Sequence, residues 1–303
     1  MKGKRSFRHA VQAVFTALTN AYAIGFVRGT VYNGPLKNIC VPGLNCYACP
    51  GALGACPIGS LQAVLGSSRY AFSRYVVGFL MAFGAICGRL VCGYLCPFGL
   101  VQDLLHKIPL PGGWKLKKVR TFKGDGALRR LKYAVLAVFV VLLPMVWVNE
   151  AGGGEPWFCK LICPAGTLGG GIPLLAVNET LRGMAGWLFG WKMLILLAVV
   201  ALSVLLYRPF CKYLCPLGAV YSFFNKASFY RMGIDPEKCI HCGACERACR
   251  MNVPFLKDQN HPECIRCGDC KRACPKGAVR TGFVPCRHVK GHRMEKNERK
   301  CAE

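Results

Sequence analysis

The sequence predicts a mainly α-helical fold class: a four-helix transmembrane bundle built as a two-fold parallel internal repeat, followed by a small α+β module rich in cysteine. Three observations carry this prediction. Four apolar stretches approach the length of a membrane span, basic residues alternate between the segments that connect them, and one cysteine motif recurs in both halves. Together these features favour a membrane protein over a soluble domain.

The apolar stretches give the candidate spans. A helix needs about 20 residues to cross a hydrocarbon core of about 30 Å. The chain has 303 residues, 53% of them hydrophobic, and the candidate spans lie near residues 10–27, 75–96, 133–148 and 187–207. The first stretch also resembles a signal peptide, because a basic start leads to an apolar run that contains AYA. Cleavage there would leave the later spans unchanged.

Charge predicts the orientation of these spans. The chain carries 40 Lys and Arg against 14 Asp and Glu, a net charge of +26. Nine basic residues lie between Lys107 and Lys132 and nineteen follow the fourth span, whereas the segments 28–74 and 149–186 hold four and two. Because basic residues concentrate in cytoplasmic loops, both termini are expected in the cytoplasm of a multi-pass protein of the cell membrane. The charges follow topology, so we expect no nucleic-acid partner.

The cysteine motifs divide the chain into domains. Residues 1–226 form the expected membrane domain, in which CYACPGALG (46–54) and CGYLCPFGLV (92–101) of one half correspond to CKLICPAGTLG (159–169) and CKYLCPLGAV (211–220) of the other. Two halves with the same orientation are expected to pack about an axis along the membrane normal. Residues 227–281 form the cysteine-rich module, and residues 282–303 form a basic tail.

The module carries the most specific signal. CIHCGACERAC (239–249) and CIRCGDCKRACP (264–275) both have the spacing of bacterial two-cluster ferredoxins, in which the fourth cysteine of each run binds the other cluster. The predicted ligands of one [4Fe-4S] cluster are Cys239, Cys242, Cys245 and Cys274. Those of the second cluster are Cys264, Cys267, Cys270 and Cys249. The alternatives are a zinc module, which usually has two separated pairs, and disulfides, which a reducing cytoplasm disfavours.

The CxxxCP motifs predict a further site between the two halves. Cysteines four residues apart share one helix face, and the proline after the second cysteine favours the start of a new helix with free N–H groups. Such a positive helix end suits an anionic cluster. The predicted cytoplasmic-side ligands are Cys92, Cys96, Cys211 and Cys215. Buried structural thiols are the weaker alternative.

The same logic predicts an outer site. Its expected ligands are Cys46, Cys49, Cys159 and Cys163. Cys56, which is also followed by proline, is an alternative to one of these ligands, and Cys87 is a further candidate for metal binding. A set of disulfides stays open as an alternative, because the outer face can be oxidising. Haem is not expected, because the chain has no CxxCH motif and no histidine inside the four apolar stretches.

The CxxxCP motifs and the module that follows them resemble the NapH-type polyferredoxins, whose relatives include the membrane portion of NosR-type proteins and cytochrome oxidase accessory iron–sulfur proteins. The resemblance covers residues 75–280, and the segment CYACPGALGACPIGSLQ departs from it by its additional cysteines. The resemblance implies membrane-bound electron transfer that involves the quinone pool or a partner reductase. The expected cofactors are two [4Fe-4S] clusters in the module and up to two in the membrane domain.

The predicted function is that of an electron-transfer subunit, not a self-contained enzyme. Its expected partners are an acidic ferredoxin or flavodoxin-like donor, attracted by basic residues, and quinone or a redox partner in the membrane or outside the cytoplasm. One alternative is an accessory factor for the maturation or metal reduction of another redox enzyme. A second is a redox-sensing regulator that uses the basic tail.

Overall fold

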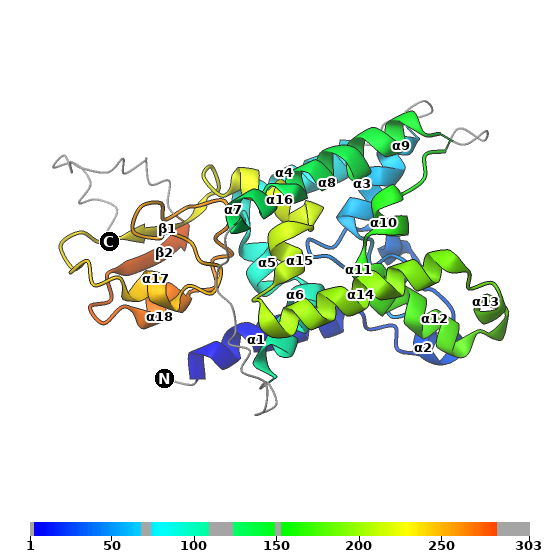
Figure 1. Cartoon of the computed structure of the whole chain (residues 1–303), viewed down its shortest axis with the longest axis horizontal. Helices are drawn as coiled ribbons and strands as arrows, with labels where there is room; N and C mark the ends of the chain where they lie inside the picture. Colours follow the sequence, from blue (N-terminus) through cyan, green and yellow to red (C-terminus); the bar gives the residue numbers. More distant parts are fainter. Residues whose placement is uncertain (1–2, 68–73, 109–123, 149–152, 284–303) are drawn as a thin grey trace.

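The computed structural model describes residues 3–67, 74–108, 124–148 and 153–283 of the chain (Figure 1). Most of the predicted basic tail, from residue 284 onward, and the basic segment 109–123 lie outside these ranges. The described residues form a large helical part and, at one end of it, a small module with two strands.

The first half of the helical part is built from short helices. Its elements are α1 (Gly3–Thr19), α2 (Ile24–Arg28), the 3-10 turn η1 (Pro35–Asn38), α3 (Pro57–Gly66), α4 (Arg74–Cys87), α5 (Leu90–Tyr94) and α6 (Pro97–Lys107). The second half has a comparable series. Its elements are α7 (Asp125–Leu128), α8 (Leu131–Val135), the π-helical η2 (Leu136–Leu142), α9 (Leu143–Val146), α10 (Trp157–Leu161), α11 (Pro164–Gly166), the π-helical η3 (Thr167–Gly171), α12 (Ile172–Val177), α13 (Glu179–Gly183), α14 (Trp187–Leu205), α15 (Pro209–Tyr213) and α16 (Pro216–Phe224).

The four predicted spans take different forms in the structure. Among the described residues, only α14 is long and apolar enough to cross a membrane, while α4 and Pro164–Val177 are shorter apolar helices. The first stretch is interrupted after Thr19, where the side chain of Asn20 donates to the carbonyl of residue 16 at 3.0 Å. The second is interrupted at Gly88, whose φ of +52° leaves the helical region. Residues 131–146 form a third helical run that includes widened π-helical turns.

The surface of α14 is apolar over most of its length. Only 17% of its most apolar 18-residue stretch is buried, and the side chains of Leu194 and Leu197 are each 59% exposed. Soluble monomers rarely expose an apolar patch of this kind, so this face is suited to lipid or to another apolar surface.

Four short helical segments begin with a proline directly after a cysteine. These are α3, α6, the run that starts with α11, and α16, which follow Cys56, Cys96, Cys163 and Cys215. Each of the four cysteines has an extended backbone, as expected for a residue before proline, and each proline occupies the first helical turn, where its missing N–H has no cost. The four repeats of CPxG thus place four thiols at helix starts.

The cysteine-rich module is a two-stranded antiparallel sheet with two short helices. Its elements are β1 (Tyr230–Ile234), α17 (Ala244–Ala248), α18 (Asp269–Ala273) and β2 (Val279–Phe283). The strands pair from Tyr230 with Phe283 to Ile234 with Val279, and α17 packs against α18. Strands that are distant in sequence therefore close the module around its two cysteine runs.

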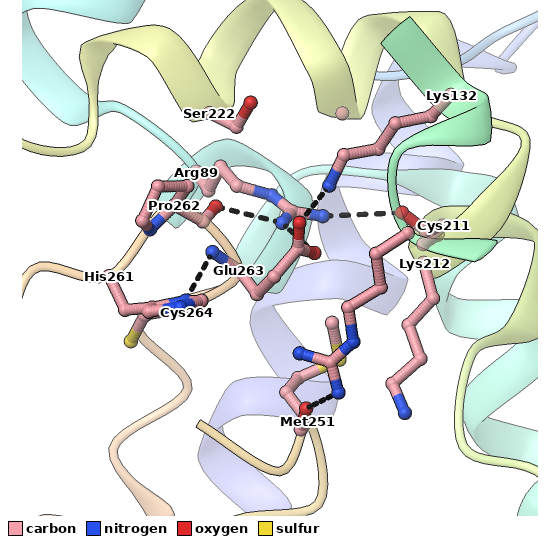
Figure 2. A network of polar contacts seen from close by, with 12 residues as sticks. Arg89, Lys132, Cys211, Lys212, Ser222, Met251, His261, Pro262, Glu263 and Cys264 are labelled. Atoms are coloured by element: carbon pink, nitrogen blue, oxygen red, sulfur yellow. Dashed lines mark hydrogen bonds and ion pairs between the residues drawn. The ribbon is translucent and has the colours of Figure 1, made fainter. Parts of the chain in front are cut away.

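A buried ion network joins the module to the helical part (Figure 2). Glu263 of the module pairs with Arg89 at 2.8 Å and also contacts Lys132, and both basic side chains are fully buried. Burial by itself would raise the pKa of Glu263, but the charges of Arg89 and Lys132 outweigh it and lower this pKa to about 2. Glu263 is therefore ionised, and Asn225 donates to the carbonyl of Cys264 at 2.8 Å beside it.

We expect Arg89→Met to lower the free energy of unfolding by about 3–5 kcal/mol, because breaking a buried ion pair leaves a charge without its partner. Arg280→Gln is the control, since Arg280 pairs with Asp235 at an exposed position where ion pairs contribute at most about 1 kcal/mol. Urea titration of the detergent-solubilised protein measures both changes. Equal losses for the two variants would contradict a structural role for the buried network.

Candidate functional site

The eight cysteines of the module line two separate pockets. One pocket is lined by Cys239, Cys242, Cys245 and Cys274. The other is lined by Cys249, Cys264, Cys267 and Cys270. Apolar side chains such as Leu256 and Val279 complete the lining of the first pocket, and Met232 and Phe255 complete the lining of the second pocket. In each pocket three thiols come from one run and the fourth from the other, which is the grouping that the spacing predicts.

Backbone geometry turns the two cysteine runs around their pockets. His241 and Arg266 occupy equivalent positions between the first two cysteines of each run, and both have a positive φ, 51° and 54°. Gly243 and Gly268, two residues later, have φ values of 68° and 75°. Residues in this left-handed conformation direct successive N–H groups to one side, which suits an anionic ligand. Short helices follow at once and carry the third cysteine of each run.

Backbone donors also reach the last cysteine of each run. The N–H of Val253 donates to Cys249 Sγ at 3.5 Å, and the N–H of Ala278 donates to Cys274 Sγ at 3.2 Å. In both runs the donor is four residues after the cysteine. Donors of this kind stabilise negative charge on sulfur.

A third group of thiols lies where the two halves of the helical part meet, and we call it the near site because it faces the module. It consists of Cys92, Cys96, Cys211 and Cys215, all buried and close enough that their thiolate forms would repel one another. These are the four residues that the sequence predicts for this site. The near site therefore takes two thiols from each half.

Polar groups surround the thiols of the near site. The N–H groups of Gly99 and Gly218 donate to Cys96 Sγ and Cys215 Sγ, both at 3.4 Å. The side-chain amide of Gln102 donates to Cys211 Sγ at 3.1 Å, and its oxygen accepts the N–H of residue 210 at 3.2 Å. Gln102 is completely buried, so its orientation is fixed by these two bonds.

Two buried arginines cross between the halves at the near site. Arg89 and Arg208 each precede a cysteine of this site by three residues, and each donates to the opposite cysteine: Arg89 to the carbonyl of Cys211 and Arg208 to that of Cys92. Arg208 pairs with Asp103 at 2.6 Å within the helical part. Both guanidinium groups are excluded from solvent, so they place fixed positive charge beside the thiols.

A fourth group of thiols lies farther from the module, near α3, α10 and α11 (Figure 1), and we call it the distal site. It consists of Cys46, Cys56, Cys159 and Cys163, whose thiolate forms would repel one another across the group. Here the structure departs from the predicted set. Cys56 takes the place expected for Cys49, because Cys56 precedes a helix-starting proline in the CPxG pattern.

The remaining cysteines of the membrane domain are not surrounded by three other thiols, although Cys49 lies close enough to Cys46 to interact with its charge. The Sγ atom of Cys49 lies 3.6 Å from the side-chain oxygen of Asn20, and Cys49 also packs beside Gly169. The Cys87 carbonyl accepts a hydrogen bond from Arg266 at 2.8 Å, at the junction with the module. Cys40 lies beside Ala55 in an isolated strand-like contact. Neither Cys49 nor Cys87, both candidates from the sequence, has the four-thiol surroundings of the near and distal sites.

The chemistry of the four groups fits iron–sulfur clusters. All cysteines in the described parts of the chain are free thiols, and within the same residues no three His, Cys, Asp or Glu side chains converge closely enough to hold one metal ion. Instead, the eight thiols of the module line two pockets. Burial raises the pKa of Cys264 and Cys267 to about 11, and a bound cationic centre would favour their thiolate forms.

Sequence reasoning missed several side chains of these sites. Gln62 and Gln102 each follow a CPxG cysteine by six residues, and this repeated spacing is the signal that could have identified both glutamines. Arg89 and Lys192 are the two basic residues that fall inside the predicted spans, which also marks them as functional candidates. No local signal indicates the pairing of Arg89 with Glu263, because 174 residues separate them.

Comparison with protein families identifies 4Fe-4S binding domains in this chain. One such family matches residues 71–119 and 187–234, which include the four cysteines of the near site. A second 4Fe-4S binding domain family matches residues 232–255, which include the first cysteine run of the module. The two families therefore cover parts of both the helical part and the module.

Individual relatives give a consistent result. The chain is 29% identical to an uncharacterised protein of Methanocaldococcus jannaschii over 67% of its own length and 68% of that relative. It is 28% identical to the methylamine utilization ferredoxin-type protein MauN of Methylorubrum extorquens, and 25% identical to the ferredoxin-type protein NapH of Haemophilus influenzae. The matches span 59% of MauN and 50% of NapH. No solved structure matches the chain.

Gly93 brings the module against the near site, and its substitution tests this contact. A Cβ atom at Gly93 would lie 2.4 Å from the Ile265 carbonyl oxygen, so we expect Gly93→Ala to displace the module and increase cleavage by an added protease at residues 226–230. Gly78→Ala is the control, because the added atom would meet nothing within 4 Å. Cleavage rates followed by gel electrophoresis give the comparison. Wild-type resistance in Gly93→Ala would show that the contact does not hold the module.

Proposed function

Because the chain belongs to the NapH-type polyferredoxin family, we propose that it is a membrane-bound iron–sulfur protein that relays electrons between a cytoplasmic carrier and quinone or a partner redox enzyme. The coarse part of this statement, an iron–sulfur electron-transfer protein, follows from its 4Fe-4S binding domains and ferredoxin-type relatives. The observation that carries the rest is the direct contact between the second pocket of the module and the near site.

Backbone atoms of the module and of the helical part meet directly at this contact. Ile265, which follows Cys264, touches Gly93, which follows Cys92. The guanidinium of Arg89 lies between the two sites, close enough to Cys264 to interact with its charge while it donates to the Cys211 carbonyl. Positive charge shared by two anionic clusters would stabilise both of them in this apolar setting.

We propose that the cysteines of the module and of the near site hold [4Fe-4S] clusters, each of which takes up and releases one electron when bound. The module ligands are Cys239, Cys242, Cys245 and Cys274 for one cluster and Cys249, Cys264, Cys267 and Cys270 for the other. The near-site ligands are Cys92, Cys96, Cys211 and Cys215. The protein contributes thiolates, N–H donors and buried arginines, which hold the ligands in place and compensate their charge.

The surface near the first pocket is suited to an acidic donor. Cys242 is exposed, and Ile240 beside it is 58% exposed. Lys238 and Lys276 are exposed and line the same pocket, and Arg247 lies beside Gly243. Basic side chains around an accessible cluster would attract an acidic ferredoxin or flavodoxin-like protein, with encounter rates that fall as salt rises.

The exposed apolar surface supports the membrane assignment. Besides α14, large apolar side chains are exposed on α4, η2 and α9, including Met81, Leu142 and Met145. We propose that these elements face lipid, with the module and both termini on the cytoplasmic side as the distribution of basic residues predicts. Quinone or a membrane-bound partner then reaches the helical part from the bilayer.

Iron content tests the proposal directly. Cys92→Ser is expected to remove about four iron atoms per chain together with the matching acid-labile sulfide, because a [4Fe-4S] cluster needs four protein ligands. Cys87→Ser is the matched control, since Cys87 lies outside the thiol groups, and it should leave iron unchanged.

In the same variants, dithionite-reduced protein is mixed with a water-soluble quinone while the visible absorbance of the clusters is followed. Cys92→Ser should retain reducible module clusters but reoxidise them more slowly than Cys87→Ser. Unchanged iron content in Cys92→Ser would refute the near-site cluster. Unchanged reoxidation would refute the relay, and the accessory-factor alternative would then be preferred.

Gln102 gives a test of the near site that leaves all ligands in place. Gln102→Leu removes the N–H donor to Cys211 Sγ and should lower the reduction potential of one cluster by about 20–60 mV, the equivalent of one hydrogen bond of about 0.5–1.5 kcal/mol. Gln259→Leu in the module is the control and should leave the potentials unchanged. EPR-monitored redox titration measures both variants. An unchanged titration for Gln102→Leu would remove this side chain from the cluster environment.

A further inference from the structure

We propose that the distal site holds a cluster of its own through Cys46, Cys56, Cys159 and Cys163, with Lys192 as a partly buried counter-charge and Gln62 as a positioning residue. This inference rests on the proposed function, because it extends the same cofactor chemistry to a second site in the helical part. Cys56 replaces Cys49 of the set predicted by motif spacing, a replacement that the sequence leaves open.

The first argument is that the distal site repeats the construction of the near site. The side-chain amide of Gln62 donates to Cys159 Sγ at 3.3 Å, and its oxygen accepts the N–H of Phe158 at 2.9 Å. Gln102 makes the same pair of bonds to Cys211 Sγ and to the N–H of Phe210. Both glutamines are fully buried. Because the glutamine makes the same pair of hydrogen bonds at both sites, we expect the four thiols of the distal site to hold the same kind of ligand as those of the near site.

The helix starts repeat as well. Cys56 and Cys163 precede prolines of CPxG motifs, as do the two corresponding cysteines of the near site. The backbone N–H groups of Gly59 and Gly166 interact with the thiols of Cys56 and Cys163. A Cβ atom added at Gly166 would lie 3.7 Å from Cys46 Sγ and 3.9 Å from Cys163 Sγ, so thiols from distant segments meet at this glycine.

The second argument is the charge of Lys192. This residue belongs to the otherwise apolar helix α14, and a Cβ at Gly166 would lie 3.9 Å from its ammonium nitrogen. Its charge acts on the thiols of Cys46 and Cys159. A basic residue within an apolar segment is costly unless an anion lies beside it. Disulfides would be neutral and would leave Lys192 without an anion, whereas a thiolate-bound cluster supplies one.

The third argument is the short connection between the two sites. The backbone N–H of Leu44 interacts with the Cys96 thiol of the near site, and Cys46 of the distal site follows two residues later. Two residues span at most about 7 Å. Tyr221, fully buried, lies close enough to Cys56, Cys92 and Cys96 to interact with all three thiols. The distal site is therefore a close neighbour of the near site and could exchange one electron with it, one cluster being oxidised as the other is reduced.

Iron and acid-labile sulfide per chain, measured on the full protein in detergent, provide the test. Wild type should hold about sixteen iron atoms, the content of four clusters, and about twelve would overturn the inference. Cys56→Ser should lose about four iron atoms and the EPR signal of one reduced cluster. Cys49→Ser is the matched control and should lose none. Retention of all iron by Cys56→Ser, or an equal loss in Cys49→Ser, would overturn the ligand set.

Lys192→Met gives a second test, in which all four cysteine ligands stay in place. Removing the positive charge should shift the midpoint of one EPR signal to lower potential, or abolish that signal if the site no longer assembles. Lys160→Met is the control, because Lys160 adjoins Cys159 in sequence but pairs with Glu155 at a partly exposed position. A titration of Lys192→Met that coincides with that of wild type would overturn the role of this residue. Loss of iron in Cys92→Ser with no loss in Cys56→Ser would reject the distal site alone and leave the proposed function intact.

Discussion

The compensation of negative charge in apolar surroundings is the constraint on which the arrangement of this protein depends. A cluster held by four thiolates is anionic, and a low-dielectric interior stabilises it only when cations and hydrogen-bond donors lie beside it. Each half of the helical part answers this requirement in a similar way, with a helix start, an N–H donor and a buried basic residue. Arg89 and Arg208 serve the near site, and Lys192 lies beside the distal thiols.

One of the differences between the two halves explains how the module is attached. In the first half Asp103, seven residues after Cys96, neutralises Arg208 of the other half. The corresponding position of the second half, seven residues after Cys215, is Ser222, which carries no charge. Glu263 of the module supplies the missing carboxylate to Arg89 (Figure 2). The module therefore completes the charge balance of the helical part, in addition to being joined to it by the chain.

Much of this arrangement could be predicted from local patterns, and the failures have identifiable causes. The spacing of the ferredoxin-type runs leads to the observed grouping of their eight thiols, and the repeated CxxxCP motif leads to the four thiols of the near site. The same motif logic selects Cys49, because Cys49 also precedes a proline, yet the helix that matters starts after Cys56. The spans were harder to predict, since hydropathy does not register the break at Gly88. Pairings such as that of Arg89 with Glu263 arise only from the folded chain.

The distance in sequence between Arg89 and Glu263 has a consequence for biogenesis. Arg89 is synthesised early, but the carboxylate that neutralises it lies 174 residues downstream. Until that part of the chain has left the ribosome, Arg89 lacks the carboxylate with which it pairs in the folded protein. The charge network of the helical part is therefore complete only after the module has been synthesised.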